Sequence, residues 1–256
     1  MAAARVAVLA AALAACSSHS QGKTVRVAAA SDLTRAFEEL GKSFEQKTGI
    51  TPIFDFGSSG LLAKQIEQGA PYYLFAAANQ DYVAAAVASG HCDGASVHEY
   101  ARGRVVVWCP SGVAAPTKLT DLADPRFKRI AIANPEHAPY GKAAQQALQK
   151  AGIWDALQGR VVLGENIQAT MKYAQDGQVD AAIVALSLAV VNDGGSFLPI
   201  DQALYDPLVQ QLVVCGNGEE ADAARQLAAY VGSPDGREIM TRYGFLLPGE
   251  QPRPKK

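Results

Sequence analysis

The sequence predicts an α/β protein of two lobes, and three observations lead to this prediction. The chain has 256 residues, of which 49% are hydrophobic and 19% charged, so it can bury a substantial core. Short apolar runs alternate with helical patterns, which is typical of parallel α/β sheets. A strongly β-branched run at 103–109 separates two such series. We therefore expect two sheets, each flanked by helices, with a cleft between them.

The first series forms the first lobe. Its strands are predicted at 24–30, 50–56 and 72–78. The helix after the first strand carries Leu33, Phe37, Leu40 and Phe44 on one face, and Gly49 ends it. A helix follows each of the other two strands, because apolar residues again recur at helical spacing.

The second series begins after the break at Pro110. Its strands are predicted at 128–133, 161–163, 179–185, 197–200 and 212–215. Its helices are predicted at 141–151, 167–176 and 219–231, with a last helix that follows Ser233 and ends at Tyr243. The tail 248–256 contains three prolines and two lysines, and we expect it to be disordered.

Residues 1–15 form a short apolar run after a single basic residue, Arg5, which is typical of a secretory signal peptide. The run is too short for a comfortable membrane span. Leu13-Ala14-Ala15-Cys16 matches the lipobox of bacterial lipoproteins, in which Cys16 becomes the lipidated first residue and 16–23 a tether. The alternative is an ordinary signal peptide beside which Cys16 is incidental. We expect a periplasmic or extracytoplasmic protein that a lipid anchors to a membrane.

Composition and motifs argue against several function classes. Lys and Arg number 23 against 25 Asp and Glu, which gives a net charge of −2. This balance disfavours non-specific electrostatic binding to nucleic acid. Gly57-Ser58-Ser59-Gly60 is followed by Leu61 and so is not the G-x-S-x-G of hydrolases. The sequence has no CxxC and no HExxH motif. We expect neither an enzyme nor a bound cofactor.

The informative feature is a set of small, polar junctions where strands lead into helices. They are Ser31-Asp32, Gly57-Ser58-Ser59-Gly60, Pro139-Tyr140-Gly141 and Glu165-Asn166-Ile167. In open α/β sheets, ligands bind outside the carboxyl ends of the strands, where the first turns of helices offer unpaired N–H groups. Such junctions can build an anion site without Lys or Arg. The alternative for any single junction is an ordinary helix cap.

Five segments together resemble the periplasmic molybdate-binding proteins of bacterial ABC transporters. They are AAASDL, FGSSGLLAKQIEQGAP, NPEHAPYGKAA, IVALSLA and RYGF, in order between residues 23 and 245. The resemblance implies the type II periplasmic binding protein fold, with one lobe of 24–105 plus 217–247 and a second of 106–216. It also implies a monomer that holds molybdate or tungstate between the lobes and delivers it to the membrane permease of an ABC importer.

The resemblance places the anion ligands on four residues. The hydroxyls fall on Ser31 and Ser59, and the backbone amides on Tyr140 and Ile167. These groups would bind the oxygen atoms of the anion, so that no side chain coordinates the metal itself. Some members of the family add a tyrosine hydroxyl where this chain has Ala185, and we expect the Tyr140 hydroxyl to replace it.

A second departure from the family lies at Tyr73, where an acidic residue is usual. It is either a tolerated local change or the loss of a contact that supports the cleft. A binding protein for another anion, such as sulfate or a small carboxylate, is the nearest alternative function. An exported enzyme is a more distant one.

The resemblance also implies a disulfide between Cys109 and Cys215. Each ends a β-branched run, and these runs resemble neighbouring strands that cross between the lobes. The alternative is two buried thiols, because a disulfide requires Cα atoms within ~7 Å of each other.

Overall fold

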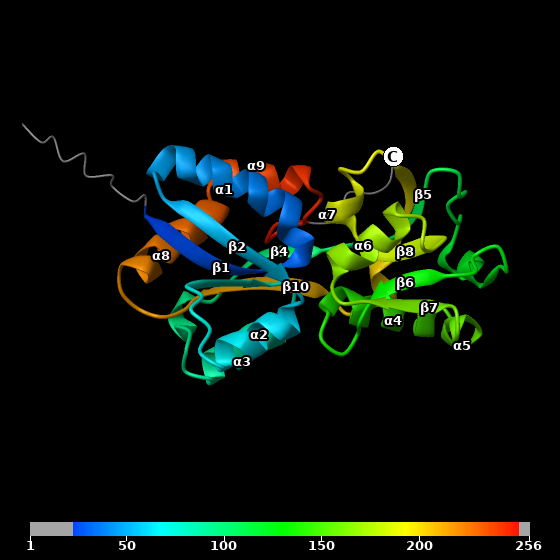
Figure 1. The fold of residues 1–256 in the computed structure, drawn as a ribbon, viewed down its shortest axis with the longest axis horizontal. Coiled ribbons are helices and arrows are strands. Elements are labelled where there is room, and N and C mark those ends of the chain that lie inside the picture. Colours follow the sequence, from blue (N-terminus) through cyan, green and yellow to red (C-terminus); the bar gives the residue numbers. More distant parts are fainter. Residues whose placement is uncertain (1–22, 251–256) are drawn as a thin grey trace, which may run out of the picture.

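The computed structural model describes residues 23–250, which form two lobes side by side (Figure 1). Each lobe is a five-stranded sheet with helices on its faces, which confirms the predicted fold class. The predicted signal segment 1–15, Cys16 and the end of the predicted tail lie outside the described residues. No helix within residues 23–250 is long and apolar enough to cross a membrane.

The sheet of the first lobe has the strand order β2-β1-β3-β10-β4. Its strands are β1 (Thr24–Ala30), β2 (Thr51–Gly57), β3 (Leu74–Ala77), β4 (His98–Gly103) and β10 (Leu208–Val214). β1 pairs in parallel with β2 and β3, whereas β10 is antiparallel to β3 and β4. We did not predict β4 as a strand separate from the β-branched run that follows it.

The sheet of the second lobe has the strand order β7-β6-β8-β5-β9. Its strands are β5 (Val105–Pro110), β6 (Ile130–Ala133), β7 (Val161–Gly164), β8 (Ala181–Ala185) and β9 (Gly195–Pro199). β6 pairs in parallel with β7 and β8, and β5 is antiparallel to β8 and β9. The strands predicted at 128–133, 161–163, 179–185 and 197–200 are therefore present in this sheet, with ends shifted by a few residues, whereas the one predicted at 212–215 lies in the first sheet.

Helices cover both faces of each sheet (Figure 1). The α-helices are α1 (Thr34–Thr48), α2 (Ser59–Glu67), α3 (Gln80–Ala88), α4 (Pro139–Lys150), α5 (Trp154–Leu157), α6 (Ile167–Gln175), α7 (Leu186–Ala189), α8 (Glu219–Val231) and α9 (Pro234–Arg242). Short 3-10 helices are η1 (Ser31–Leu33), η2 (Gly94–Ser96), η3 (Leu119–Ala123) and η4 (Gln202–Leu204). The short α5 and α7 were not predicted, because neither is long enough to show a helical period.

Alternation along the central strands explains the layers of the first lobe. Val27 of β1 and Leu74 of β3 pack with α1, whose buried face includes Phe37, and Gly49 ends this helix in a left-handed conformation (φ 71°). The neighbouring strand residues Ala28 and Phe75 pack on the other face with α2 and α3. Strands buried on both faces read as continuous apolar runs, which is the pattern of the sequence.

The chain crosses between the lobes along β4, β5 and β10. β4 continues through Arg104 into β5, and Gly103 at the end of β4 lies opposite Leu208 at the start of β10. β10 therefore runs back into the first sheet. The prediction that 106–216 belong to the second lobe was wrong for this strand, which is part of the first sheet.

The predicted disulfide between Cys109 and Cys215 was also wrong. From the crossing point at Gly103 and Leu208, β5 carries Cys109 into the second lobe and β10 carries Cys215 the opposite way. At ~3.3 Å per residue the two cysteines end up on the order of 40 Å apart. Cys109 is a buried free thiol whose pKa is raised to about 11, chiefly by burial.

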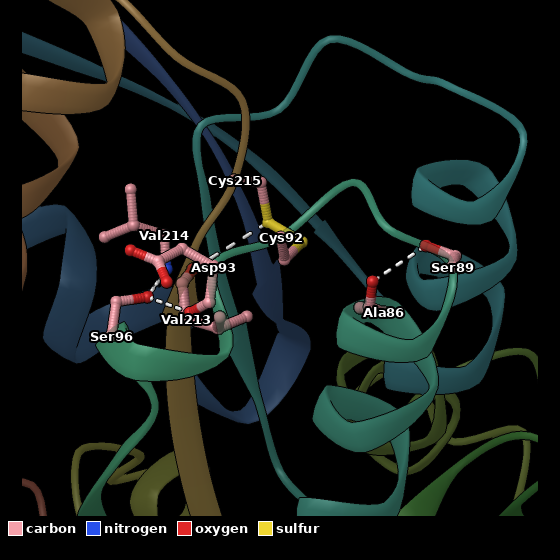
Figure 2. Close-up of a disulfide and its surroundings, with 8 residues drawn as sticks. All are labelled: Ala86, Ser89, Cys92, Asp93, Ser96, Val213, Val214 and Cys215. Carbon is pink, nitrogen blue, oxygen red and sulfur yellow. Dashed lines mark hydrogen bonds between the residues drawn. A yellow bond between two sulfur atoms is a disulfide. The ribbon is translucent and has the colours of Figure 1, made fainter.

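Cys215 instead forms a disulfide with Cys92, 123 residues earlier in the chain. Figure 2 shows this bond at the end of β10, beside the loop that follows α3. Backbone bonds support the same contact, since the Asp93 N–H donates to the Val214 carbonyl at 2.8 Å. The Val214 N–H donates to the Ser96 hydroxyl oxygen at 2.9 Å. The disulfide therefore fastens the loop at 92–96 to the outer end of the first sheet.

We predict that peptide mapping of the denatured, unreduced protein finds Cys92 linked to Cys215 and an alkylated Cys109. Reduction should lower the free energy of unfolding by roughly 2–5 kcal/mol, because the bond closes a long loop. Denaturant unfolding with and without reductant measures this difference. A peptide that links Cys109 to Cys215, or free Cys92, would contradict the prediction.

Candidate functional site

The polar junctions of both lobes meet in one small cavity. Ala30 at the end of β1 lies opposite Gly57 at the end of β2, so both strands end at the same edge of the first sheet. Ala133 of β6 lies opposite Gly164 of β7 in the same way. In Figure 1 the first of these edges faces the second lobe. The cavity is lined by Ala30, Ser31, Asp32, Gly57, Ser58, Ser59, Ala78, Ala138, Pro139, Tyr140 and Ile167.

The structure thus brings together all four residues predicted as anion ligands. Ser31 and Ser59 lie on the first lobe, and Tyr140 and Ile167 on the second. All four are buried, with 1–3% of their surface exposed. The walls lie close together: the centre of a water-sized sphere can reach only about 10 Å³ between them, which is about the space of one water molecule.

Three helices begin at this cavity. Ser59 is the first residue of α2, Ile167 the first of α6 and Tyr140 the second of α4. Within the described chain, the N–H groups of these three residues donate to no backbone acceptor. The starts of α2 and α4 also lack a side-chain cap. Unpaired N–H groups at the positive ends of helix dipoles attract an anion.

Two hydroxyls add further donors. Ser59 Oγ accepts a hydrogen bond from the Ala78 N–H at 3.0 Å, so its own hydrogen is left for another acceptor. The Ser31 hydroxyl has no hydrogen-bond partner among the described residues, although Ser31 is buried and its carbonyl accepts from Thr34. The cavity therefore presents hydroxyl and amide donors from both lobes.

No lysine, arginine or histidine is among the residues that line the described cavity. The attraction for an anion must then come from neutral dipoles, as the sequence predicted. Residues 23–250 also contain no group of three or more His, Cys, Asp or Glu that could hold a metal ion. The hydroxyl and amide donors of the described lining suit the oxygen atoms of an anion, whereas the described residues offer no cluster of side chains to coordinate a bare metal.

The lobes touch at the rim of the cavity. The Gly60 N–H donates to the His137 carbonyl at 3.0 Å, and the Ser58 hydroxyl donates to the same carbonyl. His137 Nδ1 also lies 2.9 Å from Ser58 Oγ. A Cβ at Gly60 would lie 2.7 Å from the His137 carbonyl oxygen, so only glycine permits this approach. The two lobes are thus closed on each other, and the Ser58 side chain bonds to the opposite lobe.

Asp32 forms a second contact between the lobes, deeper in the molecule. Its Oδ2 accepts from the Tyr140 hydroxyl at 3.0 Å and from Gln210 Nε2 at 2.6 Å. Its carbonyl accepts from the Ser187 hydroxyl at 2.7 Å. Burial raises the pKa of Asp32 to about 7, although the bonds from Gln210 and Tyr140 oppose this shift.

We had expected the Tyr140 hydroxyl to replace the tyrosine hydroxyl that the family has where this chain has Ala185. In the structure this hydroxyl is bonded elsewhere. It donates to Asp32 Oδ2, it accepts from Gln210 Nε2 at 3.1 Å, and it fills the space beside Gly103 at the crossing strands. Only the backbone of Tyr140 remains for an anion. Ala185 lies at the end of β8 and offers no hydroxyl.

Tyr73 lies away from the cavity. It precedes β3, at the end opposite to Ala78, and its carbonyl accepts from the Cys215 N–H at 2.9 Å. Its ring packs against Gly216 near the disulfide. This position favours a tolerated local change over a lost support behind the cleft.

Sequence reasoning did not find His137 and Gln210. His137 acts through its carbonyl, which no side-chain pattern reveals. Gln210 is a fully buried glutamine inside a strand, and its partner Asp32 lies 178 residues away. A polar residue within an apolar run was the only signal.

Comparison with known proteins places these features in context. A family model described as bacterial extracellular solute-binding protein matches residues 25–246. The molybdate-binding protein ModA of Rhodobacter capsulatus is 33% identical over 225 residues, which cover 87% of this chain and 88% of that protein. A putative ABC transporter substrate-binding lipoprotein of Bacillus subtilis, YvgL, is 29% identical over 227 residues, covering 87% and 86%. The solved periplasmic molybdate-binding protein of Azotobacter vinelandii superposes with a TM-score of 0.81 at 31% identity, covering 88% of this chain and 99% of that one.

We predict that the ligand-free protein loses stability as the pH rises from 5 to 8. Folding raises the pKa of Asp32 from 3.8 to about 7, so between these values the folded state holds a proton that the unfolded state lacks. The contribution of this proton to the free energy of unfolding falls by at most about 1.4 kcal/mol per pH unit and levels off above the folded pKa.

Denaturant unfolding across this pH range measures the effect. Asp32→Asn should remove most of the fall, because an amide does not titrate. Asp222→Asn, an exposed change on α8, should leave it unchanged. Equal pH slopes for wild type and Asp32→Asn would contradict the assignment to Asp32.

Proposed function

Because the chain belongs to the bacterial extracellular solute-binding proteins, we propose that it captures molybdate or tungstate between its lobes and delivers the anion to the membrane permease of an ABC importer. One observation carries the proposal. Ser31, Ser59, Tyr140 and Ile167 surround a single buried cavity from both lobes with hydroxyl and amide donors. The names of the relatives from Rhodobacter capsulatus and Azotobacter vinelandii support molybdate as the solute.

The chemistry of the donors favours an unprotonated tetrahedral dianion. Backbone N–H groups can only donate, so the proton of hydrogen phosphate would have no partner, at a cost of ~1–3 kcal/mol. Molybdate and tungstate carry no proton at neutral pH. Sulfate also carries none, so the cavity must reject it by size, because donors set for long metal–oxygen bonds would hold sulfate at stretched distances.

The same donors disfavour the rival functions. A carboxylate-binding protein would gain from a guanidinium that pairs with its ligand in a bidentate manner, and the described lining has no arginine. An enzyme would need an activated nucleophile or a general base that faces the solute. Asp32 is the one acidic residue of the lining, and its bonds to Tyr140 of one lobe and Gln210 of the other fit a contact between the lobes better than a catalytic base. Capture followed by release to a permease needs only lobe closure, and we propose that the protein acts as a monomer without a cofactor.

We expect molybdate and tungstate at micromolar concentration to raise the melting temperature of ligand-stripped protein, while sulfate and phosphate do not. A solute that binds only the folded state adds about 2.7 kcal/mol at a hundredfold excess over Kd. A thermal shift series with the four anions measures this. Stabilisation by sulfate alone would make this a binding protein for another anion, and no shift with any of the four would refute the proposed function.

A pair of serine variants tests the site in the same assay. Ser31→Ala should weaken molybdate binding by roughly 1.5–3 kcal/mol and leave the melting temperature without anion unchanged, because the Ser31 hydroxyl has no protein partner. Ser59→Ala should weaken binding and also lower that temperature, since the Ala78 N–H loses its acceptor. Ser89→Ala, whose hydroxyl bonds only within its own lobe, is the matched control.

We also propose that Cys16 carries lipid and holds the protein on a membrane, with the lobes outside the cytoplasm. Cys16 lies outside the described residues, so the support comes from the lipobox and from the relative named as a lipoprotein in Bacillus subtilis. The disulfide between Cys92 and Cys215 fits an oxidising compartment. Two or three acyl chains would hold the protein firmly near its transporter.

We predict that Cys16→Ser abolishes incorporation of labelled palmitate and moves the protein from the membrane fraction to the soluble one. Cys109→Ser is the control, because its buried thiol is not a lipidation site. If wild type and Cys16→Ser are both soluble and unlabelled, the segment 1–15 is an ordinary signal peptide.

A further inference from the structure

Asp32 is one of the residues of the first lobe on which the second lobe closes. Two groups of the second lobe donate to it, the Tyr140 hydroxyl to the carboxylate at 3.0 Å and the Ser187 hydroxyl to the main-chain carbonyl at 2.7 Å. Gln210 of the first sheet supports the carboxylate from behind at 2.6 Å. Asp32 is 1% exposed and follows Ser31 directly, so the contact lies beside the proposed anion ligands.

Tyr140 connects this contact to the cavity. Tyr140 lines the cavity at the start of α4, where its N–H group has no backbone acceptor, while its hydroxyl reaches Asp32 beside the crossing strands. The space for the hydroxyl depends on Gly103, since a Cβ there would lie 2.2 Å from it. A movement that separates the lobes would therefore take the Tyr140 amide from the anion and the Tyr140 hydroxyl from Asp32 together.

We propose that Tyr140, Asp32 and Gln210 form a latch that sets how long the closed lobes retain the anion, with Asp32 acting as a positioning residue through hydrogen bonds rather than through charge. The proposal rests on the proposed function in that it takes the anion as the retained solute. The side chains of the three latch residues bond to one another, and the only latch group among the proposed anion donors is the Tyr140 backbone amide. We therefore expect these side chains to change the dissociation rate of the anion and not its association rate.

The surroundings of Asp32 indicate that it acts through hydrogen bonds and not through charge. Asp32 Oδ1 and Gln210 Oε1 are both buried without a hydrogen-bond partner among the described residues, although they belong to two side chains that are bonded to each other. An amide at position 32 can accept from Tyr140 and Gln210 through its oxygen as the carboxylate does. It can also donate to an orphaned oxygen such as Gln210 Oε1.

The test measures association and dissociation rates of molybdate by stopped-flow fluorescence for matched variants. Tyr140→Phe keeps the backbone amide and should raise the dissociation rate roughly 10- to 100-fold, with the association rate within about twofold of wild type. Asp32→Leu should do the same, whereas Asp32→Asn should dissociate more slowly than Asp32→Leu. Tyr72→Phe is the control, because this buried tyrosine donates to Gln65 Oε1 at 3.1 Å within its own lobe.

A second measurement needs no anion. Energy transfer between dyes on the two lobes of the ligand-free protein should report a smaller closed fraction in Tyr140→Phe than in wild type or Tyr72→Phe. Failure of wild type to bind molybdate would count against the proposed function, while a change in energy transfer would still support the latch. Unchanged dissociation rates and unchanged energy transfer in Tyr140→Phe, or equal behaviour of Asp32→Asn and Asp32→Leu, would overturn it.

Discussion

The first N–H groups of a helix have no acceptor within that helix, and this constraint organises the molecule. Parallel strands with aligned ends place the starts of α2, α4 and α6 around one cavity, where their N–H groups have no backbone partner. Enclosing unpaired donors costs free energy unless an acceptor replaces the lost water. Closure of the lobes and capture of an acceptor-rich solute are therefore favourable together and unfavourable apart.

The parts of the site that the sequence predicts are those that depend on local patterns. Ser31 and Ser59 were found because they follow apolar runs and precede helical ones, and parallel strands bring such junctions to one edge. Gln210 was not found, because its role depends on how β10 pairs with β4 and on a partner far away in the chain. β4 itself was missed because only half of its residues are fully buried, which leaves no clear apolar run.

The two errors in the predicted architecture have one physical cause, which is the direction of β10. An apolar, β-branched run predicts a strand but does not say which way the strand runs or which sheet it joins. Because β10 returns to the first sheet, it moves out of the second lobe and carries Cys215 away from Cys109. The partner Cys92 lies in a loop after α3, where no pattern marks it as close to the end of β10.

An ionised carboxyl group beside a proposed dianion site would repel the anion, and the environment of Asp32 explains why it does not oppose binding. Burial raises the pKa of Asp32 to about 7, so a large share of the folded molecules hold it neutral at neutral pH. A dianion nearby disfavours the charged form still further. The bonds from Tyr140 and Gln210 both end on Oδ2, while Oδ1 has no partner and can hold the proton. Protonation thus removes the repulsion and leaves the contact between the lobes intact, so anion capture and lobe closure do not compete at this residue.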